Sequence, residues 1–491
     1  MKRHYLALLL LLVLLFAASC SDTKMNEETS PISSSVTIDE QSFDQEESTP
    51  SRIRKDFEIK DMRGKSFHVF SCGPDDGGNW HVHDMVSEEL NGEIMNDAIY
   101  YRNEFLADTY NYKIEVTETP DPSPNKQISN FIAAADTTYD TFGVRVYTCA
   151  ALAVEGNLLD LKALPYLCTD EVWWSPSLCG PLTVGGHQYM ATGDISVVPK
   201  EGVRAYYFNK DLQKDYQLES PYDLVKAGTW TWDKMFSMMH IATNDLNGDG
   251  KMDQNDRWGL QGQPLTSYVL YTGSGESLVS KDEEDMWKIT ANEERSVSAM
   301  LQVSDLMAAA HDDVFLTWDW AGMLKMFENN QALFYTEVML HIETMRGYDV
   351  DFGIIPTPKM DEAQQEYSHF IDSTCNIFYT LPVSSPDSDS AAYILETIAY
   401  TSHFDITPAY YDVCLKAKYS RDEESSDMLD IIFSSYRMEI ADAFSLGGLY
   451  NSVTNVMSNG GNISSTLASQ EKATRKMLDK TLSKLGENNN W

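Results

Sequence analysis

The chain has 491 residues, which is enough for two or three domains, and its hydrophobic content of 43% can supply large cores. Acidic side chains outnumber basic ones by 75 to 37, so the formal net charge is −38 at pH 7. A field of that sign repels nucleic acid and anionic lipid, and we exclude nucleic-acid binding on this ground.

The first predicted element, residues 1–19, is a secretory signal. Two basic residues precede an apolar run that is too short to cross a bilayer as a helix. The small residues before Cys20 resemble those of a bacterial lipobox, although its first position is normally Leu and is Ala17 here. We therefore expect cleavage before Cys20 and a lipid on that cysteine, which would anchor an extracytoplasmic protein to the bacterial cell membrane. An ordinary signal peptide cleaved nearby is the alternative.

The next segment, residues 20–55, is predicted to be a flexible acidic tether behind the lipidated cysteine. It is rich in Ser, Thr, Glu and Asp and has few large apolar residues. Such a segment cannot bury enough apolar surface to offset the entropy that it would lose on ordering.

Beyond the tether, predicted strands and helices alternate. A buried strand over 65–73 precedes a helical pattern over 92–111, and a second strand, a helix and a third strand follow. Alternation at this spacing favours a parallel sheet covered on both faces, so the predicted fold class is α/β. The rest of the chain is mainly helical, with three further predicted strands at 202–212, 350–358 and 373–382.

The stretch "NDLNGDGKMDQNDRWGL", residues 244–260, has the pattern of a calcium loop. Residues with oxygen ligands recur along a twelve-residue frame, 245–256, and Gly250 stands where an EF-hand loop turns sharply. The predicted ligands are Asp245, Asn247, Asp249, the backbone carbonyl of Lys251, Asp253 and Asp256.

Calcium at this loop is expected to be structural. The last ligand position holds Asp256 rather than Glu, which shortens its bidentate reach and weakens the predicted affinity. A calcium sensor pairs two loops, and the sequence has only one. An acidic, Gly-rich turn that binds nothing specific is the alternative.

Six cysteines follow Cys20, and sequence alone cannot choose among their pairings. Cys168 and Cys179 bracket a short loop and are the most favoured pair. Export permits disulfides, but an anaerobic habitat would leave free thiols. No spacing among these cysteines indicates zinc.

Four stretches resemble those of one family and stand in that family's order: "VRAYYFNKDL" (203–212), "GTWTWDKMFSMMHIATNDLNGDGKMDQNDRWGL" (228–260), "NNQALFYTEVM" (329–339) and "VDFGIIPTPK" (350–359). The family is that of the extracellular solute-binding proteins of bacterial ABC importers, the sugar-binding family related to maltodextrin-binding protein. The similarity spans roughly residues 60–480. Each stretch alone is a weak signal, and their common order makes the resemblance specific.

The resemblance implies a two-lobed, periplasmic-binding-protein-like II fold with hinge crossover strands and a helix-rich second lobe. Lobe 1 is expected over 56–185 and 350–400, and lobe 2 over 186–349 and 401–491. A monomer of this kind captures a small solute, here a mono- or oligosaccharide, between its lobes and delivers it to importer permease subunits. The calcium loop would then lie on the outer part of lobe 2, away from the cleft.

Candidate ligand contacts follow from the rule that strand ends and the loops after them face a cleft in α/β folds. Aromatic faces suit sugar rings, and carboxylate and hydroxyl groups suit their hydroxyls. Each candidate also has an ordinary structural interpretation, since aromatic residues fill cores and Gly-Asp is a common turn pair. The candidates are Trp80, Tyr147, Thr148, Asp194, Ser196, Trp318, Tyr335 and Glu337.

Two other functions stay open, a secreted carbohydrate-active lipoprotein and a calcium-dependent adhesion lipoprotein. A glycoside hydrolase needs two carboxylates about 5–10 Å apart, and 75 acidic residues offer too many pairs to discriminate. The sequence has no Gly-x-Ser-x-Gly elbow, His-Glu-x-x-His or Walker loop, which excludes several other enzyme classes. We therefore predict a binding protein without enzymatic activity, and the abundance of aromatic residues favours carbohydrate.

Overall fold

A computed structural model describes residues 52–73, 80–419 and 422–489. The predicted signal peptide, the lipid on Cys20 and most of the predicted tether lie outside these residues. Within them the chain is mixed α/β with two main sheets, so the predicted fold class is confirmed. None of the described helices is both long enough and apolar enough to cross a membrane.

The first main sheet has four strands in the order β12-β3-β1-β2. β1 (Lys65–Cys72) pairs in parallel with β2 (Tyr112–Thr119) and with β3 (Thr141–Val144). β12 (Phe378–Thr380) returns from much later in the chain and adds an antiparallel edge. β3 and β12 are wholly buried, as expected for strands covered on both faces.

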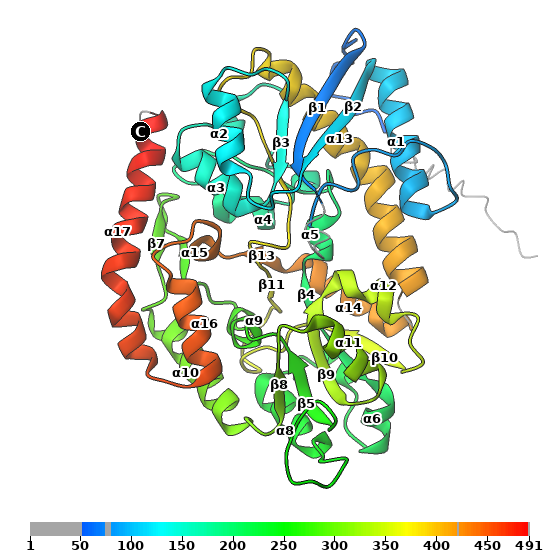
Figure 1. The fold of residues 1–491 in the computed structure, drawn as a ribbon, viewed down its shortest axis with the longest axis vertical. Helices are drawn as coiled ribbons and strands as arrows, with labels where there is room; N and C mark the ends of the chain where they lie inside the picture. The colour runs from blue at the N-terminus through cyan, green and yellow to red at the C-terminus, as the bar shows by residue number, and fades with distance from the viewer. Residues whose placement is uncertain (1–51, 74–79, 420–421, 490–491) are drawn as a thin grey trace, which may run out of the picture. The chain divides into compact units, whose positions relative to one another are not determined.

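Two pairs of helices flank this sheet (Figure 1). α1 (Ile94–Tyr110) packs against α13 (Ser388–Pro408) and β2, and α2 (Asn125–Ala133) packs against α3 (Val146–Val154) beside β3. α1 begins where the Glu93 carboxylate accepts the Asn96 N–H at 2.9 Å, which satisfies a helix N-terminus. It ends at Asn111, whose left-handed φ of 56° is typical of a residue that stops a helix.

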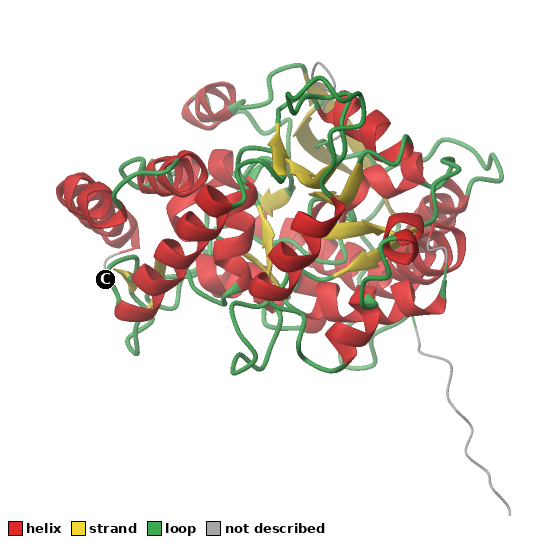
Figure 2. Ribbon diagram, turned by 90° about the horizontal axis from the view of Figure 1, so that it is seen from below, coloured by secondary structure: helices red, strands yellow, loops and turns green. Residues whose placement is uncertain are grey.

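The second main sheet has five strands in the order β10-β4-β9-β5-β8. Its central strands β4 (Arg204–Asn209) and β9 (Ala332–Val338) run antiparallel and are buried along their whole length. β5 (Trp258–Gly262) lies parallel to β9 and to β8 (Val314–Leu316), and β10 (Phe352–Ile355) closes the other edge. Figure 2 shows the strands of both sheets enclosed by helices.

The helices around the second sheet come from all later parts of the chain. α8 packs on β5, α11 on β9, and α6, α7 and α14 on β10, whereas α9, α10, α16 and α17 form a neighbouring helical layer. Their bounds are α6 Lys210–Asp215, α7 Pro221–Lys226, α8 Trp232–Ala242, α9 Thr266–Gly273, α10 Glu294–Ala309, α11 Trp320–Glu328, α14 Glu423–Ser434, α16 Leu449–Asn459 and α17 Ile463–Asn489.

Shorter elements connect these layers. The strands β6 (Val279–Lys281) and β7 (Trp287–Ile289) form one hairpin-like pair, and β11 (His369–Ile371) pairs with β13 (Tyr436–Met438). The short helices are α4 Pro176–Leu182, α5 Val198–Glu201, α12 Ile342–Met345, α15 Ile440–Ala443, η1 Leu161–Ala163, η2 Val172–Trp174, η3 Met339–His341 and the π-helical η4 Ala409–Tyr419.

The expected lobe boundaries at residues 350 and 400 differ from the structure. β10 pairs with β4 in the second sheet, whereas the expected lobe 1 groups residues 350–400 with residues 56–185 of the first sheet. α13 continues past residue 400 to Pro408 beside α1 of the first sheet. The chain crosses from the second sheet to the first after β10. The hydrophobic patterns of β10 and α13 do not show which of the two sheets each element packs with.

Residues 52–55, predicted as the end of the tether, are held against α13. Arg52 pairs with Asp405 at 2.8 Å, and Arg54 pairs with the buried Glu396 at 2.9 Å. The Glu396 carboxylate also accepts the indole N–H groups of Trp173 (3.1 Å) and Trp174 (2.7 Å) and the backbone N–H of Cys168. Arg52 and Arg54, at the end of the predicted tether, are therefore paired with acids far along the chain.

The cysteine pair favoured by spacing is not bridged, and no disulfide joins any cysteines among the described residues. Cys179 is buried in α4, where its thiol contacts the carbonyl of Trp174 at 3.0 Å, and burial raises the pKa of this thiol to about 12. Cys168 instead lies 3.3 Å from the Arg54 guanidinium. The two thiols therefore contact different groups, the Trp174 carbonyl and the Arg54 guanidinium, and are not bonded to each other.

Candidate functional site

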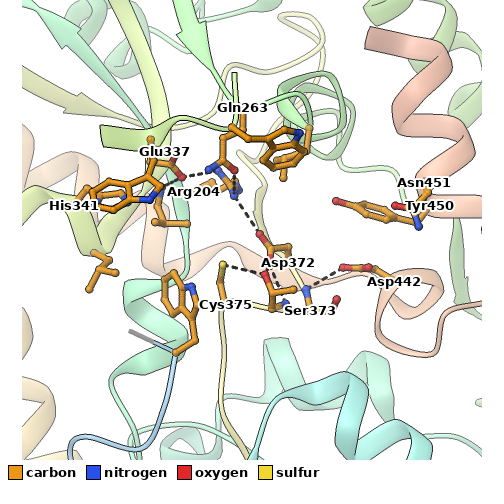
Figure 3. Close-up of a pocket in the computed structure, with 17 residues that line it drawn as sticks. Arg204, Gln263, Glu337, His341, Asp372, Ser373, Cys375, Asp442, Tyr450 and Asn451 are labelled. Atoms are coloured by element: carbon orange, nitrogen blue, oxygen red, sulfur yellow. Dashed lines mark hydrogen bonds and ion pairs between the residues drawn. The ribbon is translucent and has the colours of Figure 1, made fainter. Parts of the chain in front are cut away.

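A cavity of about 450 Å³ lies at one edge of the second sheet (Figure 3). Its lining includes Trp80, which follows the first sheet's β1, and residues 372–375, which lead towards β12. α15 and α16 supply the opposite wall with Asp442, Tyr450 and Asn451. The pocket thus combines residues from both main sheets and from the C-terminal helices.

The topology of the second sheet explains why its polar residues meet at this edge. β5, β8 and β9 are parallel, so their carboxyl ends share one edge, and the antiparallel β4 begins at that same edge. Gln263 follows β5, Trp318 follows β8, Glu337 stands near the end of β9, and Arg204 begins β4. Residues far apart in sequence are therefore placed around one opening.

Arg204 is the centre of a buried charge network. Its guanidinium donates to Glu337 at 2.9 Å, to Gln263 at 2.9 Å and to Asp372 at 3.2 Å. Burial alone would lower the pKa of Arg204, but Glu337 and Asp372 outweigh it and raise that pKa. Burial would likewise raise the pKa of Asp372, which Arg204 and Thr374 hold below its usual value. The guanidinium is therefore fully charged and already engaged by protein groups.

The pocket holds a third carboxylate, Asp442, that pairs with no cation among the described residues. Its Oδ2 accepts the backbone N–H of Ser373 at 2.9 Å. Burial and the neighbouring Asp372 raise the pKa of Asp442 to about 7. This carboxyl group therefore changes charge near neutral pH while Asp372 stays ionised.

Two buried polar atoms of the network have no hydrogen-bond partner among the described residues. They are Oε2 of Glu337 and Nε of Arg204, on side chains that are 1% and 3–4% exposed. An unsatisfied buried polar atom is costly, so such atoms are rare unless a water or ligand completes them. Glu337 therefore has acceptor capacity left over at the pocket.

Aromatic side chains form the other face of the pocket. Trp318 is 63% exposed, and Trp320 stacks on His341 with ring centroids 5.1 Å apart at 14°. Tyr450 packs edge-on against the buried Tyr268 at 4.6 Å. Exposed indole faces next to a carboxylate network are the components that saccharide sites use.

Three of the eight candidate residues line this pocket: Trp80, Trp318 and Glu337. Tyr147 and Thr148 do not, because both lie in α3 of the first sheet, where the Tyr147 hydroxyl donates to the Pro122 carbonyl at 2.9 Å and Thr148 is buried.

Asp194, Ser196 and Tyr335 also lie outside the pocket lining. Asp194 is buried between Lys200 (2.7 Å) and His403 (2.5 Å), which hold its pKa low although burial would raise it. Ser196 is buried, and its hydroxyl accepts the Val198 N–H at 3.2 Å.

Tyr335 shares a face of β9 with Glu337 but lies two residues further from the sheet edge. There Phe327 of α11 covers it, with ring centroids 5.6 Å apart. Alternation along a strand predicts which residues share a face of the sheet. It does not predict which of those residues a neighbouring helix will bury.

Sequence reasoning missed the residues that organise the charges. Arg204 had a usable signal, because a basic residue that begins an apolar strand needs a buried partner. Asp372 and Asp442 come from a connection and a four-residue helix and had no comparable signal.

The predicted calcium loop lies between α8 and β5 and contributes no residue to the pocket lining. Hydrogen bonds between Asn244 and Arg257 close its base. Asp245 accepts the N–H groups of Gly248 and Gly250 at 2.7 and 2.8 Å, and these bonds lower its pKa. Asp256, fully buried, accepts the N–H groups of two further loop residues.

Gly248 and Gly250 have left-handed φ values of 72° and 77°, so the loop turns at these two residues. No group of three or more His, Cys, Asp or Glu side chains in the described ranges is arranged to hold a metal. The side chains present are nevertheless the oxygen ligands that calcium prefers. Calcium at this loop stays a prediction.

Comparison with known proteins identifies the fold. No family model matches the sequence, and no curated protein is similar to it in sequence. Among solved structures, a cyclo/maltodextrin-binding protein complexed with maltotetraose is 12% identical, covers 86% of this chain and 96% of its own, and has a TM-score of 0.53. The cyclic α-maltosyl-1,6-maltose-binding protein of Arthrobacter globiformis is 14% identical, with 84% and 98% covered and a TM-score of 0.57.

UgpB of Mycobacterium tuberculosis, solved with glycerophosphocholine, is 13% identical, with 79% and 97% covered and a TM-score of 0.54. These likenesses establish that the chain has the two-lobed fold of maltodextrin-binding protein and of other binding proteins, as the sequence resemblance implied. The neighbours have ligands of different chemistry, so the fold does not choose the ligand.

Proposed function

We propose that the protein is a non-enzymatic binding protein that captures a carbohydrate in the pocket around Arg204. The observation that supports this most directly is the combination of exposed indole faces, Trp318 and Trp320, with a buried carboxylate network at the edge of the second sheet. Indoles stack on sugar rings, and carboxylates accept hydrogen bonds from ring hydroxyls. The structural neighbours named for maltodextrins and related glucans add support for this ligand class.

Residues from both main sheets line the pocket, so a bound solute would stabilise one arrangement of the two over another. We propose that an ABC importer recognises that ligand-bound arrangement and receives the solute. The lipid on Cys20 would keep the protein at the extracytoplasmic face of the membrane, near its permease subunits. Both parts of the proposal rest on the sequence resemblance and on the predicted signal.

A calcium ion in the loop 245–256 completes the proposal. Its role would be structural, because the loop contributes no side chain to the pocket. An ion there would neutralise clustered carboxylates and fix the long connection between α8 and β5.

Thermal unfolding of the protein against mono- and oligosaccharides tests the proposed function. A ligand that binds only the folded state stabilises it by about 2.7 kcal/mol at a hundred times its Kd, which raises the Tm by a few degrees. We expect at least one saccharide to give this shift and chromatography to recover it unchanged. If every saccharide leaves the Tm unchanged, the carbohydrate proposal is wrong, and if a bound saccharide is cleaved, the non-enzymatic part is wrong.

A further inference from the structure

We propose that the pocket selects a saccharide that carries an ammonium group, an amino sugar, over its neutral and anionic counterparts. This inference rests on the proposed carbohydrate function and specifies the ligand class of the same site. It follows from the excess of carboxylates over cations in the pocket lining and from the hydrogen bonds that already engage Arg204.

The pocket has an excess of negative charge. Three carboxylates line it, Glu337, Asp372 and Asp442, against the single guanidinium of Arg204. The other titratable lining groups, His341 from η3, Cys375 and Tyr450, are uncharged near neutral pH. Burial lowers the pKa of His341, so its imidazole stays neutral, and burial raises the pKa values of the Cys375 thiol and the Tyr450 phenol, so neither ionises. Coulomb attraction in such a partly buried site favours a cation.

Arg204 is not available to hold an anionic ligand. Its two terminal nitrogens already donate to Glu337, Gln263 and Asp372. An anionic sugar, such as a uronate or a sugar phosphate, would have to break these bonds or lie beside carboxylates. Leaving either acid buried without its counter-charge is strongly unfavourable.

Acceptor capacity in the pocket is unfilled. Oε2 of Glu337 is buried without a hydrogen-bond partner among the described residues, and Asp442 lacks any cation partner there. Carboxylates only accept, and an ammonium group only donates, so the two are complementary in type as well as in charge. A sugar hydroxyl would supply one O–H donor and no charge. The repulsion between the carboxylates of Asp442 and Asp372 would then not be offset.

The aromatic face suits the same ligand. Trp318, Trp320 and Tyr450 stand around the carboxylates, and Figure 3 shows Tyr450 next to Asp442. A sugar ring stacked there would present its substituents to the acids, and a cation beside an aromatic face is attracted by the ring electrons.

The test compares saccharides that differ only at one substituent. Glucosamine, N-acetylglucosamine and glucose, with their β-1,4-linked oligomers, carry an ammonium, an amide or a hydroxyl at the same carbon, and glucuronate supplies the anion. Maltooligosaccharides and galactosamine widen the set. Isothermal titration at pH 6.5 measures each Kd.

We expect an amino sugar to bind more tightly than its hydroxyl and amide counterparts, by about tenfold or more, as for a charge-assisted pair. Binding should also release protons, which titration in two buffers of different ionisation enthalpy detects, because a nearby ammonium drives Asp442 to ionise. A purely structural aspartate would not produce this release.

Asp442→Asn should remove most of the preference for the amino sugar and the proton release, since the amide keeps the shape and the Ser373 contact but not the charge. Asp305→Asn, on the exposed face of α10, removes one surface charge and should leave both unchanged. If Asp442→Asn does not fold, the proton release of the unaltered protein still decides the matter.

If a neutral or anionic saccharide binds as tightly as the amino sugar, the inference is wrong and the proposed carbohydrate function stands. If no saccharide binds, both are wrong. Tight amino-sugar binding without proton release, or a preference that Asp442→Asn retains, would also overturn the assigned role of Asp442.

Discussion

Two groups of acids in this molecule find their hydrogen-bond partners in opposite ways. In the loop 245–256, Asp245 accepts N–H groups only three and five residues away. In the pocket, Asp372 pairs with Arg204, 168 residues earlier in the chain, and Glu337 pairs with the same guanidinium across 133 residues. The first group depends on local backbone geometry, and the second depends on the assembly of the second sheet.

This difference decides what each group can do. The loop acids are partnered by N–H groups that belong to the loop itself, so an ion there would act on one connection. The pocket acids share one counter-charge brought by another strand, so their charge balance links β4, β9 and the segment after β11. A change at Arg204, Glu337 or Asp372 should therefore affect folding and binding together, and a change at the loop 245–256 should leave ligand binding unaltered.

The largest expected effect tests the shared counter-charge. Arg204→Met leaves Glu337 and Asp372 buried without a cation, and we expect the free energy of unfolding to fall by about 3–5 kcal/mol. Urea unfolding measures the loss. Arg475→Ala removes an exposed pair with Glu471 on α17 and should cost less than about 1 kcal/mol. Equal losses in the two variants would mean that the pocket network contributes no more than a surface ion pair.

Removing calcium tests whether the loop 245–256 contributes to stability without affecting ligand binding at the pocket. If the loop holds calcium, the ion at a hundred times its Kd adds about 2.7 kcal/mol to the free energy of unfolding, and a chelator removes this gain. Asp245→Asn combined with Asp249→Asn should abolish the calcium-dependent Tm shift without altering the Kd for a saccharide. If the Tm of the unaltered protein does not depend on calcium, the calcium prediction is wrong. If the double variant binds the saccharide with a different Kd, the loop does affect the pocket.

The pH dependence of stability tests the raised pKa of Asp442, about 7 against 3.8 for the ordinary group. Between these values the folded state binds more protons than the unfolded state, so this group's contribution to stability falls as pH rises from about 4 to 7 and then levels. Asp442→Asn removes the fall. Allowing for solvent screening in the pocket, we expect the variant to be more stable than the unaltered protein by about 2 kcal/mol at pH 8, and by much less at pH 4.

Urea titrations at the two pH values measure this difference, and Asp305→Asn on α10 serves as the control. An Asp442→Asn advantage that is the same at pH 4 and pH 8 would show that Asp442 does not titrate in this range.

The smallest effect separates binding from folding within the pocket. Trp318 is 63% exposed, so Trp318→Ala should change the free energy of unfolding by no more than about 0.5 kcal/mol. If its indole stacks on the sugar, the Kd should rise about tenfold, or about 1.4 kcal/mol. Tyr101→Ala, at a residue that is 54% exposed on α1 outside the pocket, should change neither quantity. An unchanged Kd in Trp318→Ala would exclude the indole as a ligand contact.

The sequence predicted the features whose causes are local. Periodicity and turn residues predicted the strands over 65–73 and 202–212, and the order of four stretches implied the two-lobed fold, which is confirmed. Three of the candidates chosen by the strand-end rule, Trp80, Trp318 and Glu337, line one pocket, and their contact with a ligand stays a prediction. Each of these follows from a rule about neighbours in the chain or about the edge of a sheet.

The features that sequence missed depend on which distant segments meet. Asp194 follows a turn-like glycine, but only the folded chain brings Lys200 and His403 to it, and these occupy the carboxylate. Asp442 looks like any aspartate on a short helix until the segment at Asp372 packs beside it and raises its pKa. β10 carries the same apolar pattern as a strand of either sheet, so its pairing with β4 could not be read from its residues.

The ion pairs that join Arg52 and Arg54 to α13 determine where the chain can be shortened without loss of stability. A shortened protein that starts at residue 56 would lack Arg52 and Arg54, so the buried carboxylate of Glu396 would keep its two indole donors but lose its salt-bridge partner. Burial already raises the pKa of Glu396, and removal of the guanidinium would raise it further. A soluble form should therefore begin at or before residue 52, and a protease that cleaves between Arg54 and the folded body should leave a product that melts at a lower temperature.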